Sequence, residues 1–269
     1  MKSLAKRILP LPIRVKLKQF GHHYLDLVKP VKTKRVPSRA ETFIGGGDFV
    51  AVGEHFFQTL KRHGLKENDH VMDVGCGQGR MARPLVDYLS SGAYTGLDIV
   101  KSGIDWCETE YADVPNFRFL HMDLYNLRYN KEGAIAAKDY VFPVEDASQD
   151  VIFLTSVFTH MLAEDIQSYL KEFERVLKPG GKALITWYIL DDESLQSQNR
   201  ALDFRYRFDD VSYTTLKSTP EAAIAFDKAF IKSAYEKADL MIASIEKGHW
   251  AKVDSSYMLQ DMIIATKAH

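Results

Sequence analysis

The sequence predicts a doubly wound α/β fold built on a mostly parallel sheet. From residue 70 onward, short apolar runs alternate with segments of helical periodicity, the pattern of parallel strands joined by crossover helices. The first run leads directly into the glycine-rich stretch Gly75-Cys-Gly-Gln-Gly79, and acidic residues stand at or just after the ends of the next two. Such a turn brings backbone close to a ligand at the carboxyl edge of the sheet.

The expected elements follow from apolar periodicity and from the turn residues between them. Strands are expected at residues 70–74, 93–98, 117–121, 150–154, 182–186, 240–245 and 259–266. Helices are expected at residues 49–60, 81–89, 102–111 and 166–176. Residues 191–235 break the alternation with an acidic turn and an aromatic, charged stretch, so an insertion is expected there. Loops at this edge of a parallel sheet build substrate sites, and the insertion should form a wall of that site.

The composition is that of an ordinary globular protein, with 46% hydrophobic and 26% charged residues among 269. Cys76 and Cys107 are the only cysteines, which argues against a disulfide framework or a four-cysteine zinc site and favours a cytoplasmic setting. Pro10 and Pro12 interrupt the apolar run at the start, so it is a poor signal peptide. No stretch approaches the ~20 apolar residues of a membrane span.

Charge is distributed unevenly along the chain. Residues 1–36 hold ten Lys or Arg against Asp26 alone, a net +9 that leaves −10 for the remainder. A basic segment interspersed with Leu, Ile and Val can contact an anionic membrane surface, such as the inner membrane face, or it can contact nucleic acid. Alternatively, it can be a solvated arm packed on the domain. We therefore divide the chain into a basic leader, residues 1–48, and a domain, residues 49–269.

The glycine spacing separates two classes of ligand. The dinucleotide fingerprint G-x-G-x-x-G needs a glycine where Arg80 stands, and the observed spacing is G-x-G-x-G. Asp73, two residues before the first glycine, would repel a pyrophosphate but suits an ammonium group. Asp98, 25 residues further on, could accept hydrogen bonds from ribose hydroxyls. Asp123 follows the third strand.

These motifs, Asp73-x-Gly-x-Gly-x-Gly79 with Asp98 and Asp123, resemble the class I S-adenosylmethionine-dependent methyltransferases over roughly residues 45–190. The run Phe173-Glu-Arg-Val-Leu-Lys-Pro-Gly-Gly181 is also similar to the segment before that family's fifth strand. The resemblance implies a seven-stranded sheet with an antiparallel last strand, and S-adenosyl-L-methionine as cofactor. It implies that the loop binds the methionine part, Asp98 the ribose, and that Asp123 lies near the adenine. The implied cofactor-binding residues are Asp73, Gly75, Cys76, Gly77, Gly79, Arg80, Asp98, Ile99, Met122, Asp123, Leu124 and Thr155.

The methyl acceptor should bind beside the end of the fourth strand. Methyl transfer from a sulfonium is an in-line displacement, so the protein mainly aligns the acceptor and excludes water. An alcohol acceptor gains from a general base, and His160 is the predicted base, with a helix cap or a cofactor contact as alternative roles. His249, His121 and Tyr188 are further titratable candidates. Substrate contacts are expected from Phe158, Tyr188, His249 and Trp250.

The absence of certain motifs excludes several classes of methyl acceptor. Enzymes that methylate exocyclic or amide nitrogens carry an Asn/Asp-Pro-Pro-Tyr/Phe motif after the fourth strand, and this sequence has no such motif. Covalent cytosine methylation would need a cysteine that follows a proline in that region, and neither cysteine of this chain does so. Thr155 and Ser156 stand where a metal-dependent site would want carboxylates, so no metal is expected although Asp191 and Asp192 follow the fifth strand.

The expected function is O-methylation of a small-molecule or glycosidic acceptor, such as a cell-envelope sugar or a lipid-linked glycan. A nucleic-acid partner is not expected, because the remainder of the chain is acidic. RNA or protein methylation, a non-catalytic cofactor-binding relative and a dinucleotide-dependent oxidoreductase stay as alternatives. The glycines within residues 43–49 would allow a lid over the cofactor or a flexible entry to the following helix.

Overall fold

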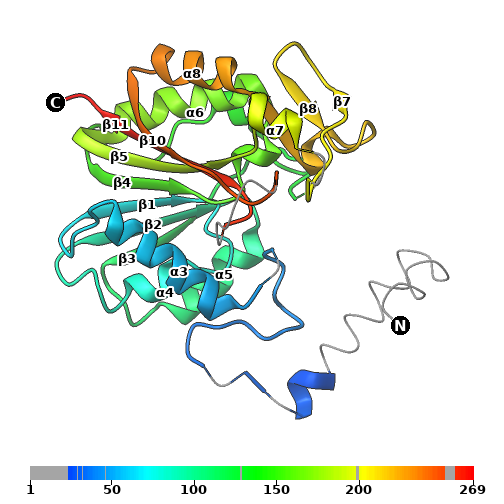
Figure 1. Cartoon of the computed structure of the whole chain (residues 1–269). Coiled ribbons are helices and arrows are strands. Elements are labelled where there is room, and N and C mark those ends of the chain that lie inside the picture. The colour runs from blue at the N-terminus through cyan, green and yellow to red at the C-terminus, as the bar shows by residue number, and fades with distance from the viewer. Residues whose placement is uncertain are drawn as a thin grey trace.

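A seven-stranded sheet forms the centre of the protein, in the order β10-β11-β5-β4-β1-β2-β3 (Figure 1). The computed structural model describes residues 24–28, 30–31, 33–45, 47–127, 129–197, 200–251 and 258–269. The strands are β1 His70–Val74, β2 Ala93–Asp98, β3 Phe117–His121, β4 Gln149–Leu154, β5 Leu177–Trp187, β10 Leu240–Glu246 and β11 Asp261–Lys267. Strands β1 to β5 pair in parallel, whereas β11 is antiparallel to both β5 and β10. The predicted fold class, including the antiparallel last strand, is confirmed.

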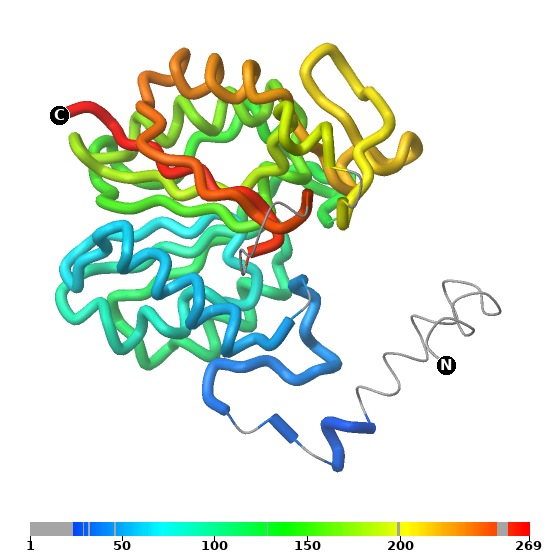
Figure 2. The backbone as a smooth tube through the Cα atoms, viewed as in Figure 1, coloured from blue at the N-terminus to red at the C-terminus, as the bar shows by residue number. Residues whose placement is uncertain are grey.

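Helices cover both faces of this sheet (Figure 1). On one face lie α3 Phe49–Arg62, α4 Ala82–Leu85 and α5 Lys101–Glu110; on the other lie α6 Ala163–Val176 and α8 Lys228–Lys237. Because side chains alternate along a strand, Val71 and Phe153 pack beneath α3 and α5 while Met72 and Ile152 pack beneath α6 and α8. Figure 2 shows the red C-terminal strand passing through the sheet between the orange β10 and the yellow-green β5. Each face of the main sheet therefore has its own apolar core.

Residues 189–227 form a second, smaller sheet that the sequence did not reveal. Its order is β6-β9-β8-β7, with β6 Ile189–Leu190, β7 Tyr206–Arg207, β8 Ser212–Thr214 and β9 Ile224–Asp227, and it carries α7 Asp192–Gln196 and the short helix η3 Pro220–Ala222. The predicted insertion at 191–235 extends too far, because residues 228–237 belong to α8. Ile231, Ala234 and Tyr235 are buried there at helical spacing, against the main sheet.

Two further boundaries differ from the prediction. The helix expected at 81–89 is reduced to α4, followed by turns; Pro84 within it lacks an amide hydrogen for the helical ladder. Strand β5 begins at Leu177 rather than at residue 182, with a register irregularity against β4 that accommodates the Pro-Gly-Gly run. Two 3₁₀ turns, η1 Ala137–Asp139 and η2 Phe158–His160, complete the described elements.

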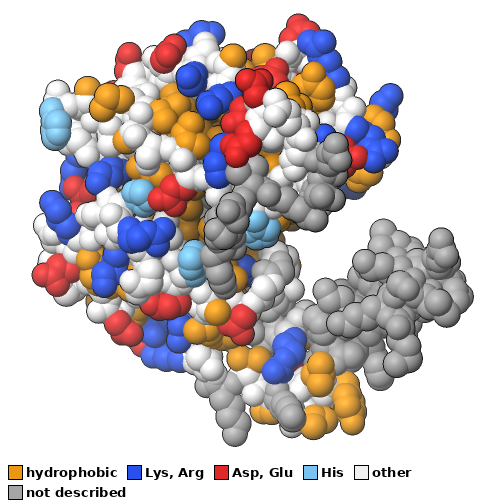
Figure 3. Space-filling model, in the orientation of Figure 1, with side chains coloured by type: hydrophobic (Ala, Val, Ile, Leu, Met, Phe, Trp, Pro, Cys, Tyr) orange, Lys and Arg blue, Asp and Glu red, His pale blue; other side chains and the backbone are white. Residues whose placement is uncertain are grey.

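Of the basic leader, residues 1–23 lie outside the described part of the chain. Residues 24–28 are helical, and Tyr24, Leu25, Leu27 and Val28 are exposed. Figure 3 shows hydrophobic side chains gathered on the surface at this end of the described chain. Further along, Lys34 and Arg35 form ion pairs with Asp113. None of the helices in the described residues is both long enough and apolar enough to cross a bilayer.

Candidate active site

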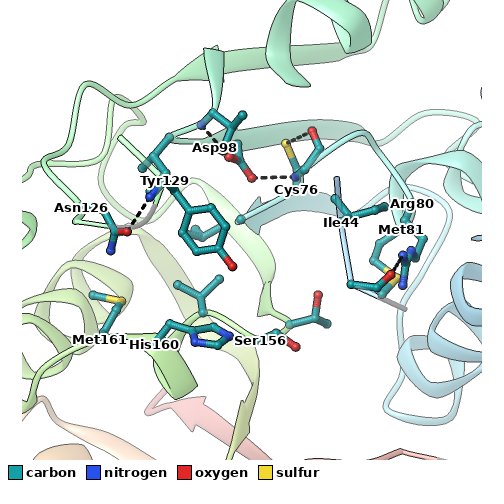
Figure 4. Close-up of a pocket in the computed structure, with 18 of the residues that line it drawn as sticks. Ile44, Cys76, Arg80, Met81, Asp98, Asn126, Tyr129, Ser156, His160 and Met161 are labelled. Atoms are coloured by element: carbon teal, nitrogen blue, oxygen red, sulfur yellow. Dashed lines mark hydrogen bonds between the residues drawn. The ribbon is translucent and has the colours of Figure 1, made fainter. Parts of the chain in front are cut away.

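A cavity of about 630 Å³ lies at the carboxyl ends of β1, β2 and β4 (Figure 4). Strand β1 has β2 on one side and β4 on the other, so the chain winds in opposite directions from this point. Open α/β sheets bind ligands at such a switch point, and the volume is within the usual ~300–1,000 Å³ of small-molecule sites. The cavity is therefore the candidate active site.

The glycine loop forms the floor of the cavity as bare backbone. Gly75 and Gly77 have φ of +84° and +56°, in the left-handed region that other residues avoid. A Cβ atom at Gly75 would lie 2.4 Å from Val157 Cγ2, and one at Gly77 would lie 2.4 Å from Ile44 Cγ2. Glycine is thus required at both positions for the chain and its neighbours to approach this closely.

Asp98 connects the end of β2 to the loop. Its Oδ2 accepts a hydrogen bond from the amide of Gly77 at 2.7 Å, and its Oδ1 accepts one from the amide of Val100 at 2.8 Å (Figure 4). Burial raises the pKa of this carboxyl, and the backbone hydrogen bonds oppose that rise. The side chain also lines the cavity, where its remaining lone pairs could accept hydrogen bonds from a ligand.

An apolar surface continues from Asp98. Ile99, Met122 and Leu124 line the cavity, and Thr155 lines it at the end of β4. Asp123 lies between the buried residues Met122 and Leu124, but its own side chain is exposed and is not part of the cavity lining. The apolar side chains form a slot suited to a flat ring, whereas the expected contact of Asp123 with an adenine stays a prediction.

Asp73 does not reach the cavity, contrary to the expected direct contact with an ammonium group. It shares a strand face with Val71, so its side chain enters the core beneath the loop, where Tyr94 donates a hydrogen bond to Oδ2 at 2.7 Å. Its Oδ1 has no hydrogen-bond partner among the described residues. Burial raises the pKa of Asp73 to about 8, with a smaller contribution from the charge of Asp98. Asp73 is therefore a largely neutral carboxyl near neutral pH.

The segment before α3 closes one side of the cavity. Phe43, Ile44 and Gly45 are among the lining residues, in the place predicted for a lid. The amide of Phe43 donates to Gln78 Oε1, and the guanidinium of Arg80 donates to the carbonyl of Gly45. Arg80 thus lines the cavity and also anchors this segment to the glycine loop. Cys76 lines the cavity as well, whereas Gly79 does not.

His160 lies on the opposite side, in η2. Its Nδ1 is 2.8 Å from the backbone carbonyl oxygen of Glu221, which belongs to η3 of the insertion. Because a carbonyl oxygen only accepts, Nδ1 carries the hydrogen, and in the neutral ring Nε2 carries the lone pair. His160 and Tyr129 project into the cavity from opposing sides (Figure 4).

The four predicted substrate contacts separate into two pairs. Tyr188 and His249 line the cavity. Phe158 and Trp250 are buried and do not: Phe158 packs edge-on against Trp187, and the indole N–H of Trp250 donates to Asp261 Oδ2 at 2.7 Å. The last two are core residues, because apolar packing and a buried carboxylate satisfy them completely.

Several lining residues had no sequence signal. Asn126 and Tyr129 come from the loop between β3 and β4, Ser156 follows β4, and Gln260 precedes β11. Ser156 lies within the segment singled out for His160, but nothing in the spacing distinguished its hydroxyl. Gln260 is brought in only because β11 inserts beside β5.

Comparisons with known proteins agree with this architecture. Residues 72–185 match the family described as a methyltransferase domain. A solved S-adenosylmethionine-dependent methyltransferase from Methanosarcina mazei superposes with a TM-score of 0.54 at 21% identity, over 78% of this chain and 97% of that one, a likeness of fold. Residues 72–185 thus match a methyltransferase domain, and the fold around them is the one that S-adenosylmethionine-dependent methyltransferases share.

Curated relatives share this methyltransferase domain but differ in the acceptor they are named for. A sterol 4-C-methyltransferase of Caenorhabditis elegans is 28% identical over 121 residues, 45% of this chain and 31% of that protein. A tRNA N(3)-cytidine methyltransferase of Gallus gallus is 28% identical over 134 residues, 46% of this chain and 32% of that protein. The chain spans about a third of the length of these relatives.

The residues of the cavity fit S-adenosylmethionine, the cofactor of this methyltransferase domain. The bare loop offers space that a Cβ would fill, Asp98 offers carboxylate lone pairs for hydroxyl groups, and the slot lined by Met122 and Leu124 suits a base. When bound, this cofactor supplies a methyl group carried on a positively charged sulfur. Transfer of the methyl group breaks its bond to that sulfur, and the rest of the cofactor is left as a neutral thioether.

Proposed function

We propose that the protein transfers a methyl group to an oxygen atom of an uncharged small-molecule or glycosidic acceptor. The observation that carries the proposal is the imidazole of His160, fixed by Glu221 on the wall of a cavity with few charges. Among the described residues that line the cavity, Arg80 and Asp98 are the only Lys, Arg, Asp or Glu, and both belong to the cofactor end. A phosphate or carboxylate on the acceptor would be desolvated there without a charged partner, at considerable cost.

In the proposed reaction, His160 acts as general base. The acceptor hydroxyl loses its proton to Nε2 of the neutral imidazole while its oxygen forms the bond to the methyl carbon. The hydrogen bond from Nδ1 to the Glu221 carbonyl holds the ring plane and the tautomer, and it also stabilises the imidazolium that forms.

The mouth of the cavity supports an acceptor with an apolar, lipid-like part. Phe43, Tyr125, Tyr129 and Leu259 line the cavity and are nevertheless 39–52% exposed. Exposed apolar side chains gathered at the rim of a pocket commonly mark binding surfaces. A lipid-linked glycan could place its sugar inside and its apolar group across this rim.

The basic leader is proposed to bring the domain to an anionic membrane surface. Residues 1–36 carry a net +9, and Leu27 and Val28 are 83% and 58% exposed. Co-sedimentation of the full chain with anionic vesicles, compared with neutral ones, should be reduced by the double substitution Leu27→Asp/Val28→Asp. Equal sedimentation of both forms would refute the contact.

Methyl transfer from radiolabelled S-adenosylmethionine to fractionated cell extract tests the acceptor class. Label should enter small or organic-soluble molecules and resist mild base, as methyl ethers do. Label in RNA, protein or base-labile esters would contradict the proposal.

The substitution His160→Asn tests the base. The asparagine amide N–H takes approximately the place of Nδ1–H and can still donate to the Glu221 carbonyl, while the base is removed. We expect turnover to fall by about 10²–10⁴-fold with little change in cofactor affinity. A large loss of cofactor affinity with normal turnover at saturation would reassign His160 to binding.

A further inference from the structure

A buried polar network stands beside His160 and has no role in the reaction as described so far. Its centre is Gln260, whose side chain is 8% exposed. Oε1 of Gln260 accepts a hydrogen bond from the Ser156 hydroxyl at 3.1 Å, and Nε2 donates to the hydroxyls of Tyr188 and Thr159, both at 3.3 Å. Three of these residues, Ser156, Tyr188 and Gln260, line the cavity.

The network determines the direction of the Tyr188 hydroxyl. Its oxygen accepts a hydrogen from Gln260, so its own hydrogen must point elsewhere. No acceptor for that hydrogen is found in the described part of the chain, although the residue is only 4% exposed. Burial raises the pKa of Tyr188, so the group stays a phenol at neutral pH. The result is a desolvated O–H donor on the wall of the cavity.

Ser156 fixes the other end of the network. Its φ is +60°, a conformation that is unfavourable for a non-glycine residue and typical of functional sites. Its amide donates to Thr186 Oγ1 at 2.8 Å, and its hydroxyl donates to Gln260. The conformation therefore directs the hydroxyl to Gln260, and this contact orients the amide group that in turn faces Tyr188.

We propose that the Tyr188 hydroxyl donates the hydrogen bond that recognises the methyl acceptor, and that Gln260 and Ser156 are positioning residues for it. This inference rests on the proposed methyl transfer to an uncharged acceptor and narrows the class. The acceptor carries a carbonyl, ether or hydroxyl oxygen beside the methylated position, because a donor-only group such as an ammonium would meet the Tyr188 O–H with no lone pair.

Three small molecules of one ring size test this class of ligand. Cyclohexanone accepts hydrogen bonds only, cyclohexanol both accepts and donates, and cyclohexylammonium donates only. Ligand-observed NMR competition on the full chain with S-adenosylhomocysteine bound should show binding of the ketone and the alcohol but not of the ammonium ion. Preferential binding of the ammonium ion to the unaltered protein would overturn the proposal.

Two substitutions then separate recognition from structure. Tyr188→Phe should weaken cyclohexanone about five- to tenfold, the effect of one hydrogen bond. In Gln260→Glu, the carboxylate only accepts, so it takes the Tyr188 hydrogen and leaves a lone pair toward the cavity. Selectivity should then shift from the ketone toward the ammonium ion, a change that misfolding cannot produce. The part of this shift that depends on the phenol, rather than on the new negative charge in the cavity, should be absent in the double substitution Gln260→Glu/Tyr188→Phe.

Controls keep the outcome decisive. Tyr206→Phe, on β7 and outside the cavity lining, should leave all three probes unchanged. S-adenosylhomocysteine affinity should be unchanged in Tyr188→Phe and in Gln260→Glu, which shows that the cofactor half is intact. Unaltered ketone binding in Tyr188→Phe, or unaltered selectivity in Gln260→Glu, would overturn the proposal. These binding assays need no turnover, so they test acceptor recognition alone. A failure of the proposed O-methylation would instead be seen in the labelled-extract experiment.

Discussion

The substitution Asp98→Asn separates cofactor binding from the support that Asp98 gives to the glycine loop. Both carboxylate oxygens are engaged, with Gly77 and Val100 amides at 2.7 and 2.8 Å. An asparagine side chain has one oxygen and one NH₂ in the same places, so it satisfies one backbone N–H and presents a donor to the other. Loss of one charge-assisted hydrogen bond should lower the free energy of unfolding by about 1.5–3 kcal/mol without any ligand.

Cofactor affinity should fall in addition. A ribose hydroxyl that donates to the Asp98 carboxylate loses a charged acceptor, again about 1.5–3 kcal/mol, which corresponds to a roughly 10–100-fold rise in Kd. Calorimetric titration with S-adenosylhomocysteine measures this loss, and urea unfolding of the ligand-free protein measures the first one.

The two measurements together can refute the ribose contact. A less stable Asp98→Asn protein whose Kd stays within twofold of the unaltered protein would show that Asp98 only supports the loop. Asp113→Asn is the matched control, since Asp113 is an exposed carboxylate bonded to Lys34 and Arg35, away from the cavity lining. It should leave the Kd unchanged.

Two other substitutions test the packing around the loop. Gly77→Ala places a Cβ 2.4 Å from Ile44 at a φ of +56°, so the free energy of unfolding should fall by about 1–2 kcal/mol. Gly45→Ala is the control and should leave it unchanged, because no atom lies within 4 Å of the added Cβ. Equal shifts of the melting temperature in both variants would contradict this reasoning. Asp73 has its pKa raised to about 8 in the folded state from 3.8, so the stability it confers is full below pH ~4 and is lost as pH rises toward 8. Relative to Asp73→Asn, the unaltered protein should therefore lose up to ~1.4 kcal/mol per pH unit over that window in urea unfolding, and parallel pH profiles would refute the raised pKa.

Strands β1 to β3 were predictable because the burial or partial burial of most of their side chains leaves a plain apolar pattern in the sequence. The expected bounds of β1, β2 and β3 coincide with the observed ones, since each strand is a short, largely apolar run with turn or loop residues around it. The second sheet escaped prediction because its strands are two to four residues long and hold no period that a sequence can display. Tertiary contacts, rather than local preference, make those strands.

The glycine loop and Asp98 could be predicted to lie together because they are close in the sequence or stand at adjacent strand ends. Gly75 and Gly77 are two residues apart, and Asp98 lies at the adjacent strand end, so spacing alone indicates their convergence. The misplaced residue, Asp73, could have been recognised by strand alternation, because it shares a face with Val71. The acid before the loop was assigned to the ligand, whereas its side chain belongs to the core.

The acceptor half depends on long-range assembly, and this explains why family resemblance carries so little information about it. Tyr129, His160, Tyr188 and Gln260 come from four separate segments, and the orienting carbonyl of Glu221 comes from the insertion. Each segment can change without disturbing the glycine loop, which allows one domain to serve relatives named for a sterol and for a tRNA base. The acceptor must therefore be inferred from the direction of individual donors and lone pairs in this half, and the orientation of Tyr188 by Gln260 is the most specific of these.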